Sequence, residues 1–195
     1  RTYTIHLSDN RSYNDGTKIT AKDYAFSLLL GGAPEIAQLG GTQKGMNHIV
    51  GYDAYQGGQT KVLGGVRMVS DTAFSIEVSG DYLPYFYGLA MLNVTPYPMH
   101  VIAPNCDVQD DGQGVYLSGS SGQGFTTDML RSTLMDPQSG YLANPKVTCG
   151  PYNLTSYNAS TGEVQMTANS NYLGNYEGRK PRIEKLTLKH VQNST

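Results

Sequence analysis

Apolar and polar residues alternate in several short stretches of the chain, a pattern typical of strands that bury one face. Residues 3–7 (YTIHL) alternate in this way from the start of the sequence. Residues 66–69 and 74–78 also alternate, and the Ser-Asp-Thr turn between them predicts a hairpin. The same reasoning predicts further strands at residues 152–157, 164–167 and 183–191.

A helical period follows the first strand. The turn residues 14–16 (NDG) precede Thr20 and Asp23, which have the spacing of a helix N-terminal capping box. The polar residues before this helix therefore have structural roles rather than catalytic ones. Gly31 and Gly32 end the helix, and its apolar face consists of Tyr24, Ala25, Leu28 and Leu29.

Three more helices are predicted. Residues 52–56 form a short one, residues 81–92 a longer one that Asp81 caps, and residues 127–134 a third that Pro137 closes. Residues 104–124 are predicted to be a loop. Tyr82, Tyr85 and Tyr87 surround Pro84, where helical spacing favours packing roles, although tyrosines also suit a binding surface.

Composition narrows the class of protein. The chain has 195 residues, enough for one domain or for one large and one small lobe. Its net charge of -2 provides no basic surplus, so no nucleic-acid partner is expected. No apolar run has the length of a membrane span. The sequence starts with Arg inside a predicted strand, so we expect a piece of a longer protein.

Motifs for metal, phosphate or nucleophile chemistry are incomplete. Residues 119–124 are glycine-rich but lack the lysine of a phosphate-binding loop. Residues 107–112 begin like a calcium loop, yet the twelfth position is Ser118 where a glutamate is needed. The four histidines (His6, His48, His100 and His190) are scattered, and we expect no metal, no cofactor and no enzymatic activity. Cys106 and Cys149 are either a disulfide or two separate thiols.

Several motifs in order resemble those of the family 5 extracellular solute-binding proteins, the oligopeptide, dipeptide and nickel receptors of ABC importers. Residues 13–27 (YNDGTKITAKDYAFS) are similar to the family's Ser-Asp-Gly-Thr signature and the helix after it. Residues 49–58 and 65–78 resemble its next two motifs, and residues 148–154 (TCGPYNL) stand where the family has Gly-Thr-Gly-Pro-Tyr. The sequence departs from the family pattern at Ser70, Cys149 and Ser170. These departures leave the subfamily and the ligand open, rather than the family itself.

The resemblance implies an α+β fold with a mixed or antiparallel sheet and a few packed helices. This fold is part of a periplasmic-binding-protein-like type II fold, of which the chain would be a segment from the N-terminal half. Residues 1–145 would form an accessory domain, and residues 146–195 would be strands that return to the first ligand-binding lobe. Apolar faces turned towards the missing parts would favour self-association.

The resemblance also implies a function. The chain would belong to a receptor that captures peptides or another small solute outside the cell and delivers them to an ABC permease in the membrane. The receptor would be extracellular or periplasmic, with a lipid anchor upstream of this sequence. Cys149, Gly150 and Tyr152 are the predicted ligand-side residues, because Gly150 permits close approach to the backbone; the alternative is a tight turn that closes a strand.

Two alternatives stay open. The Tyr, Asn and Gly content also suits a cell-surface adhesion or glycan-binding module, which predicts an all-β fold. A hydrolase with an unrecognised site predicts a buried cleft that holds an acid or a histidine with a shifted pKa. Helices at residues 20–30 and 84–92 would count against the adhesion module.

Overall fold

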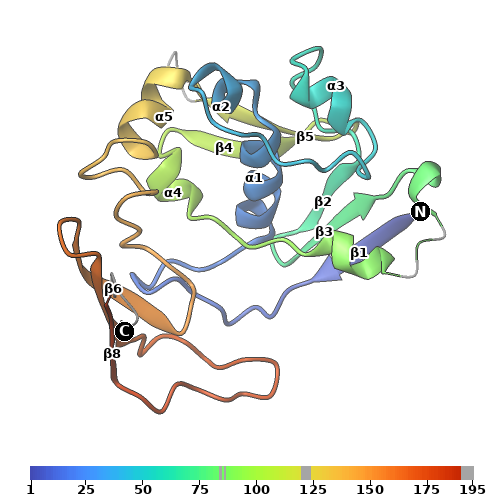
Figure 1. The fold of residues 1–195 in the computed structure, drawn as a ribbon. Coiled ribbons are helices and arrows are strands. Elements are labelled where there is room, and N and C mark those ends of the chain that lie inside the picture. The colour runs from blue at the N-terminus through green and yellow to red at the C-terminus, as the bar shows by residue number, and fades with distance from the viewer. Residues whose placement is uncertain (84, 86, 120–123, 190–195) are drawn as a thin grey trace.

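The computed structural model describes residues 1–83, 85, 87–119 and 124–189. The sequence predictions that concern Pro84, Phe86, His190, Val191 and the centre of the glycine-rich segment 119–124 lie outside these residues. The described elements form three small sheets with helices packed beside them (Figure 1). Every described strand pair is antiparallel, so the predicted α+β class is confirmed.

The first sheet has the order β1-β3-β2. Strand β1 (Thr2–His6) pairs with β3 (Ala73–Glu77), which pairs on its other side with β2 (Val66–Ser70). A bulge between Met68 and Ser70 shifts the register of the β2–β3 hairpin. Both the first strand and this hairpin are confirmed; burial alternates along β1, whereas four consecutive residues of β3 are buried.

Helix α1 (Ala21–Gly32) begins where the capping box predicts. The backbone N–H of Thr20 donates to Oδ2 of Asp23 at 2.8 Å, which is one half of that box. The helix ends after Gly32, as predicted, and the short helix α2 (Pro34–Gln38) follows Ala33.

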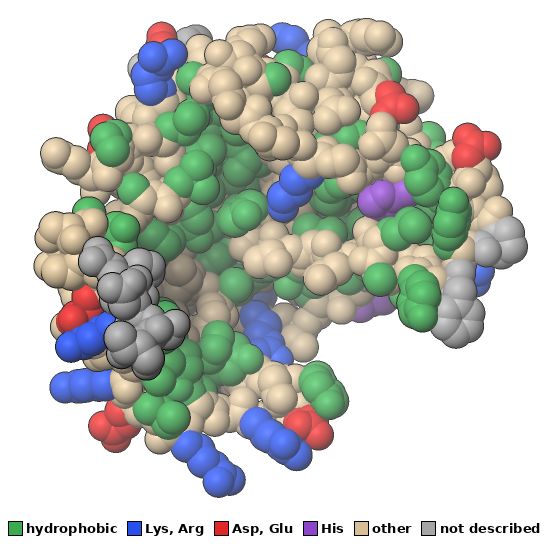
Figure 2. All heavy atoms as spheres, in the orientation of Figure 1, with side chains coloured by type: hydrophobic (Ala, Val, Ile, Leu, Met, Phe, Trp, Pro, Cys, Tyr) green, Lys and Arg blue, Asp and Glu red, His purple; other side chains and the backbone are tan. Residues whose placement is uncertain are grey.

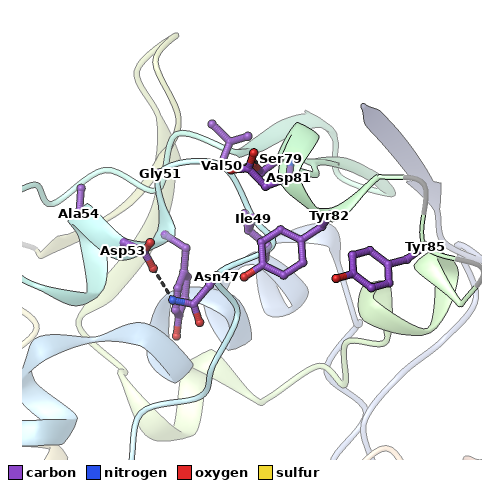
Figure 3. A pocket seen from close by; sticks show the side chains of 11 residues that line it. Asn47, Ile49, Val50, Gly51, Asp53, Ala54, Ser79, Asp81, Tyr82 and Tyr85 are labelled. Carbon is purple, nitrogen blue, oxygen red and sulfur yellow. Dashed lines mark hydrogen bonds between the residues drawn. The ribbon is translucent and has the colours of Figure 1, made fainter.

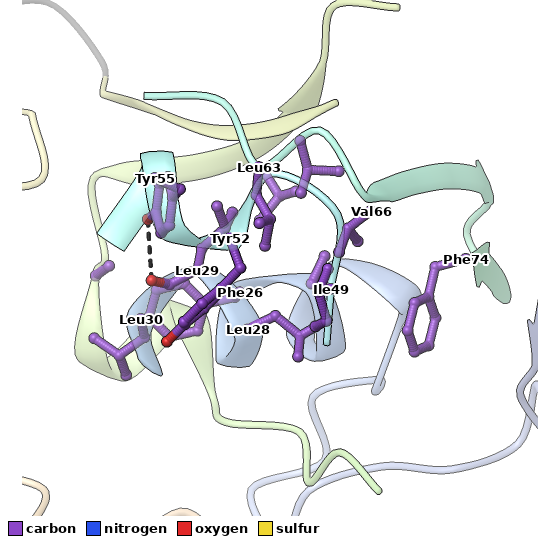
Figure 4. Close-up of a cluster of buried hydrophobic side chains, with 14 of the residues drawn as sticks. Phe26, Leu28, Leu29, Leu30, Ile49, Tyr52, Tyr55, Leu63, Val66 and Phe74 are labelled. Atoms are coloured by element: carbon purple, nitrogen blue, oxygen red, sulfur yellow. Dashed lines mark hydrogen bonds between the residues drawn. The ribbon is translucent and has the colours of Figure 1, made fainter. Parts of the chain in front are cut away.

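The main hydrophobic core surrounds α1 (Figure 4). Helix α3 (Tyr52–Gln56), predicted correctly, buries Tyr52 and Tyr55 against α1, and the Tyr55 hydroxyl donates to the carbonyl of Leu29 at 3.0 Å. Burial of such large side chains is the main favourable contribution to folding. The other large, fully buried core residues include Phe26, Leu29, Leu63, Val66, Phe74 and Ile76.

The prediction of a loop at residues 104–124 is wrong for the described residues 106–119, which form a hairpin. Helix α4 (Met99–Ile102) leads into strand β4 (Cys106–Asp110), which forms a hairpin with β5 (Val115–Gly119). Val108 and Val115 are fully buried in the core, and Val115 also bridges to Leu63. These long-range contacts stabilise strands that the polar local sequence does not indicate.

The prediction of one helix at residues 81–92 is also wrong. In this stretch, the residues that the structure describes form two short 3₁₀ helices, Gly80–Tyr82 (η1) and Gly88–Leu92 (η2). Leu83 and Tyr85 lie outside both helices. Tyr85 and Tyr87 are exposed, so they do not have the core-packing role that helical spacing favours. Helix α5 (Thr127–Thr133) is confirmed, and the side chain of Thr126 caps it by accepting from the Met129 N–H at 3.3 Å.

A third sheet lies to one side of the other elements (Figure 1). Its order is β6-β7-β8, with strands β6 (Tyr152–Asn158), β7 (Glu163–Ala168) and β8 (Lys185–Leu188). All three strands were predicted from the sequence. In the part of the chain that the structure describes, no helix has the length and apolar character needed to cross a membrane.

Candidate functional site

The predicted ligand-side residues lie at the entry to the third sheet. Cys149 and Gly150 belong to an irregular segment, and Tyr152 is the first residue of β6. All three residues are half-buried. The segment therefore lies partly at the surface, between the α1 core and the C-terminal sheet.

The Cys149 thiol belongs to a group of titratable side chains at this junction. Burial raises the pKa of Cys149, and the Asp23 carboxylate raises it further. The thiol is therefore protonated at neutral pH, which makes it a poor nucleophile or metal ligand. Burial likewise raises the pKa of Tyr141 to about 12 and raises the pKa of Tyr13, with Cys149 contributing to both shifts. Cys106 and Cys149 are free thiols, which settles the disulfide alternative.

The space next to the Cα atom of Gly150 is open. A Cβ atom added at Gly150 would meet no other atom within 4 Å. Its carbonyl is held from behind by the Asn169 side-chain amide, which donates to it at 2.9 Å. The Tyr152 hydroxyl donates to the carbonyl of Ile183 at 3.0 Å and its oxygen remains able to accept.

The turn at residues 14–16 makes a contact that sequence reasoning missed. The Asn14 N–H donates to the Thr148 carbonyl at 2.9 Å, directly beside Cys149. Next to it, burial tends to raise the pKa of Asp15, but the Thr17 N–H and the His100 ring hold this pKa below its usual range. Nε2 of His100 lies 2.8 Å from Oδ2 of Asp15. Local sequence signals identify the turn, whereas these partners are brought close only by the fold.

The acidic residues that resemble a calcium loop are used in ion pairs instead. Nζ of Lys22 lies 2.7 Å from Oδ2 of Asp107, and Nε of Arg67 lies 2.8 Å from Oδ2 of Asp110. Within the described ranges, no three His, Cys, Asp or Glu side chains come together in an arrangement that holds a metal ion.

A separate surface hollow of about 660 Å³ lies beside η1 (Figure 3). The Tyr82 and Tyr85 rings line one side with their centroids 6.2 Å apart, and Asn47 donates to Asp53 on the other side at 2.5 Å. Another hollow of about 860 Å³ separates residues 137–146 from the β6–β7 hairpin. Figure 2 shows further apolar side chains on the surface of the C-terminal sheet; Tyr157 and Leu188 in this sheet are exposed, as is Ile183 just before β8.

The sequence model of the bacterial extracellular solute-binding proteins, family 5 Middle, matches residues 1–195. The chain belongs to this family. The family consists of solute receptors rather than enzymes, which argues against the hydrolase alternative. The adhesion alternative also required an all-β fold, which helix α1 contradicts.

Similar family 5 proteins are oligopeptide-binding and dipeptide-binding proteins. The periplasmic oligopeptide-binding protein OppA of Salmonella typhimurium is 29% identical over 104 residues, which are 52% of this chain and 19% of OppA. A dipeptide-binding protein of Lactococcus lactis is 34% identical over 89 residues, 44% of this chain and 15% of that protein.

Solved structures share the fold over nearly the whole chain. Lactococcal OppA, complexed with an endogenous peptide, has a TM-score of 0.64 at 17% identity and covers 97% of this chain. NikZ from Campylobacter jejuni, in complex with Ni(L-His), has a TM-score of 0.54 at 17% identity and also covers 97%. The chain spans 30% of the first and 28% of the second, well under half of either protein.

Proposed function

We propose that the chain is part of the substrate-binding component of an ABC importer, with oligopeptides or dipeptides as its solutes. The observation that carries this proposal is the match of the family 5 model to the full length of the chain. The oligopeptide- and dipeptide-binding proteins among its relatives support peptides as the solute class. The partner that receives the solute would be an ABC permease in the membrane.

Within such a receptor, residues 1–145 would be the accessory domain, and residues 146–195 would contribute strands to the first ligand-binding lobe. The separate position of the β6-β7-β8 sheet supports this division (Figure 1). A solute held between two lobes is gripped by closure of one lobe on the other, so a single lobe binds it weakly.

The solute would approach the segment from Cys149 to Tyr152. The predicted contacts are backbone groups of Cys149 and Gly150 and the ring of Tyr152. The Cys149 thiol itself is partly buried and is influenced by the charge of the Asp23 carboxylate. The open space at Gly150 supports this assignment, because a peptide backbone needs such space to form hydrogen bonds.

Two further features belong to the proposal. The exposed apolar residues of the C-terminal sheet would favour self-association of the isolated chain. A lipid anchor would hold the receptor at the outer face of the membrane, as its family resemblance suggests.

The decisive experiment is to purify the receptor from its host and identify co-purified small molecules by native mass spectrometry. We expect bound peptides of mixed sequence that are released on unfolding. A receptor that carries a nickel complex, a sugar or no solute at all would refute peptides as the solute class.

A further inference from the structure

Asn14 directs all four of its polar groups to the C-terminal part of the chain. Its backbone N–H donates to the Thr148 carbonyl at 2.9 Å, and its Oδ1 accepts from the Thr148 N–H at 3.0 Å. Its Nδ2 donates to the Lys146 carbonyl at 2.8 Å. Its backbone carbonyl accepts from the Asn171 side-chain amide at 3.0 Å. One residue of an N-terminal turn is thus bonded at four points to residues more than 130 positions away.

The neighbours of Asn14 hold it in place. The Tyr13 side chain is completely buried, and its ring lies 5.6 Å from the His100 ring. Asp15 accepts from the Thr17 N–H at 2.8 Å and pairs with His100. Gly16 closes the turn with a φ of 89°, a conformation that few other residues adopt. These contacts of its neighbours fix the position of Asn14 in the turn.

The segment that Asn14 binds has little regular structure of its own. Residues 144–150 are neither helix nor strand. Besides the bonds to Asn14, its carbonyls accept from the Tyr141 hydroxyl at Val147 and from the Asn169 side-chain amide at Gly150, each at 2.9 Å, and short backbone bonds join Asn144 to Gly140 and Lys146 to Asn144. Backbone groups that lack a helix or sheet partner must find other partners, and here Asn14 supplies several of them.

We propose that Asn14 is the positioning residue that holds the Cys149–Tyr152 segment in its solute-facing conformation. Its importance for solute capture rests on the function proposed above, whereas its effect on the segment does not. Asn14 touches no solute in this proposal; it acts through Thr148 and Lys146. Loss of its side chain lets the segment open locally while the α1 core remains folded.

The two free thiols make this opening measurable. Cys149 lies in the segment, whereas Cys106 lies in β4, and both are half-buried. Alkylation by iodoacetamide requires local opening at each thiol, and peptide mass spectrometry gives a separate rate for each. We expect Asn14→Ala to accelerate alkylation of Cys149 about tenfold, since two side-chain hydrogen bonds are lost, and to leave the Cys106 rate unchanged.

Two further variants complete the test. Asn171→Ala removes only the hydrogen bond to the Asn14 carbonyl. This variant should also raise the alkylation rate of Cys149, by a smaller factor than Asn14→Ala. Asn47→Ala removes a side-chain hydrogen bond to Asp53 in the distant hollow and should change neither rate. An unchanged Cys149 rate in Asn14→Ala, or equal acceleration of both thiols, would overturn the positioning role.

The same assay separates this inference from the proposed function. An equimolar mixture of synthetic tetrapeptides, added to the receptor purified from its host, should slow alkylation of Cys149 in the unmodified protein. If the peptides leave that rate unchanged while Asn14→Ala still accelerates it, the positioning role stands and the solute-facing assignment is wrong.

Discussion

Nε of Arg67 donates to both carboxylate oxygens of Asp110, at 3.0 and 2.8 Å, and so joins strand β2 to the end of strand β4. Oδ2 of Asp110 also accepts from the Met68 N–H at 2.9 Å, and Oδ1 accepts from the Gly112 N–H at 2.9 Å. A carboxylate that resembles part of a calcium loop in the sequence is thus the link between two sheets.

Asp110→Asn should destabilise the fold in a pH-dependent way. Burial tends to raise the pKa of Asp110, but Arg67 and the two backbone donors lower it overall. The carboxylate therefore stabilises the fold above its unfolded pKa of about 3.9, and this contribution is lost as the pH falls through the lower folded pKa. At neutral pH we expect a loss of about 1 kcal/mol in the free energy of unfolding.

Urea denaturation at a series of pH values measures this effect. The difference between Asp110→Asn and the unmodified chain should shrink below about pH 4. Asp9→Asn, a change at an exposed aspartate, is the control and should cost almost nothing. A pH-independent difference for Asp110→Asn would contradict the assigned role of its charge.

The two glycines at the end of α1 should respond differently to alanine. A Cβ at Gly32 would lie 2.7 Å from the ring of the fully buried Tyr52, so Gly32→Ala should cost about 1–3 kcal/mol. A Cβ at Gly31 would meet only the flexible ends of Lys44 and Met46, at 3.1 Å each. Gly31→Ala should be neutral or stabilise by up to about 1 kcal/mol, because alanine favours helix. Thermal unfolding of both variants tests whether Gly32→Ala is the less stable of the two. A less stable Gly31→Ala variant would refute this packing at the end of α1.

The sequence predicted those helices and strands that are determined by neighbouring residues, such as a helix cap or a short alternating run. The Thr20–Asp23 capping box predicted the start of α1, and short runs of alternating apolar and polar residues on either side of a turn predicted the β2–β3 and β6–β7 hairpins. The β4–β5 hairpin was missed because its stability comes from Val108 and Val115 in a distant core.

The candidate site was predictable only in part. The resemblance at residues 148–154 pointed to the segment, and Gly150 does have open space around it. No local pattern indicates that Asn14 binds this segment, because the contact joins residues more than 130 positions apart. Likewise, the burial of the Cys149 thiol beside Asp23 depends on the packed junction rather than on neighbouring sequence.

His48 should make the stability of the fold fall in mildly acidic solution. Burial lowers the pKa of His48, although a hydrogen bond to the Met91 backbone opposes this shift. The unfolded chain therefore binds the proton more readily, and the free energy of unfolding decreases as the pH falls below the unfolded pKa of about 6.5. One such group gives a slope of at most about 1.4 kcal/mol per pH unit.

Replacement of this ring provides the test. His48→Phe keeps an aromatic ring against Tyr82, 6.2 Å away in the present structure, and removes the titration. Denaturation between about pH 5 and pH 7 should show a flatter slope for His48→Phe than for the unmodified chain. An equal slope in His48→Phe and in the unmodified chain would exclude His48 as its source.

We propose that Gly150 faces the solute in the receptor, and a binding measurement with Gly150→Ala is the sharpest test of this claim. Equilibrium dialysis of the receptor purified from its host, against a mixture of synthetic tetrapeptides, measures affinity. The matched control is Gly80→Ala, because a Cβ has open space at both positions and neither glycine has a positive φ. We predict unchanged affinity for Gly80→Ala and about tenfold weaker binding for Gly150→Ala, since a methyl group there obstructs the peptide backbone. Equal affinity of the two variants and the unmodified receptor would contradict the claim.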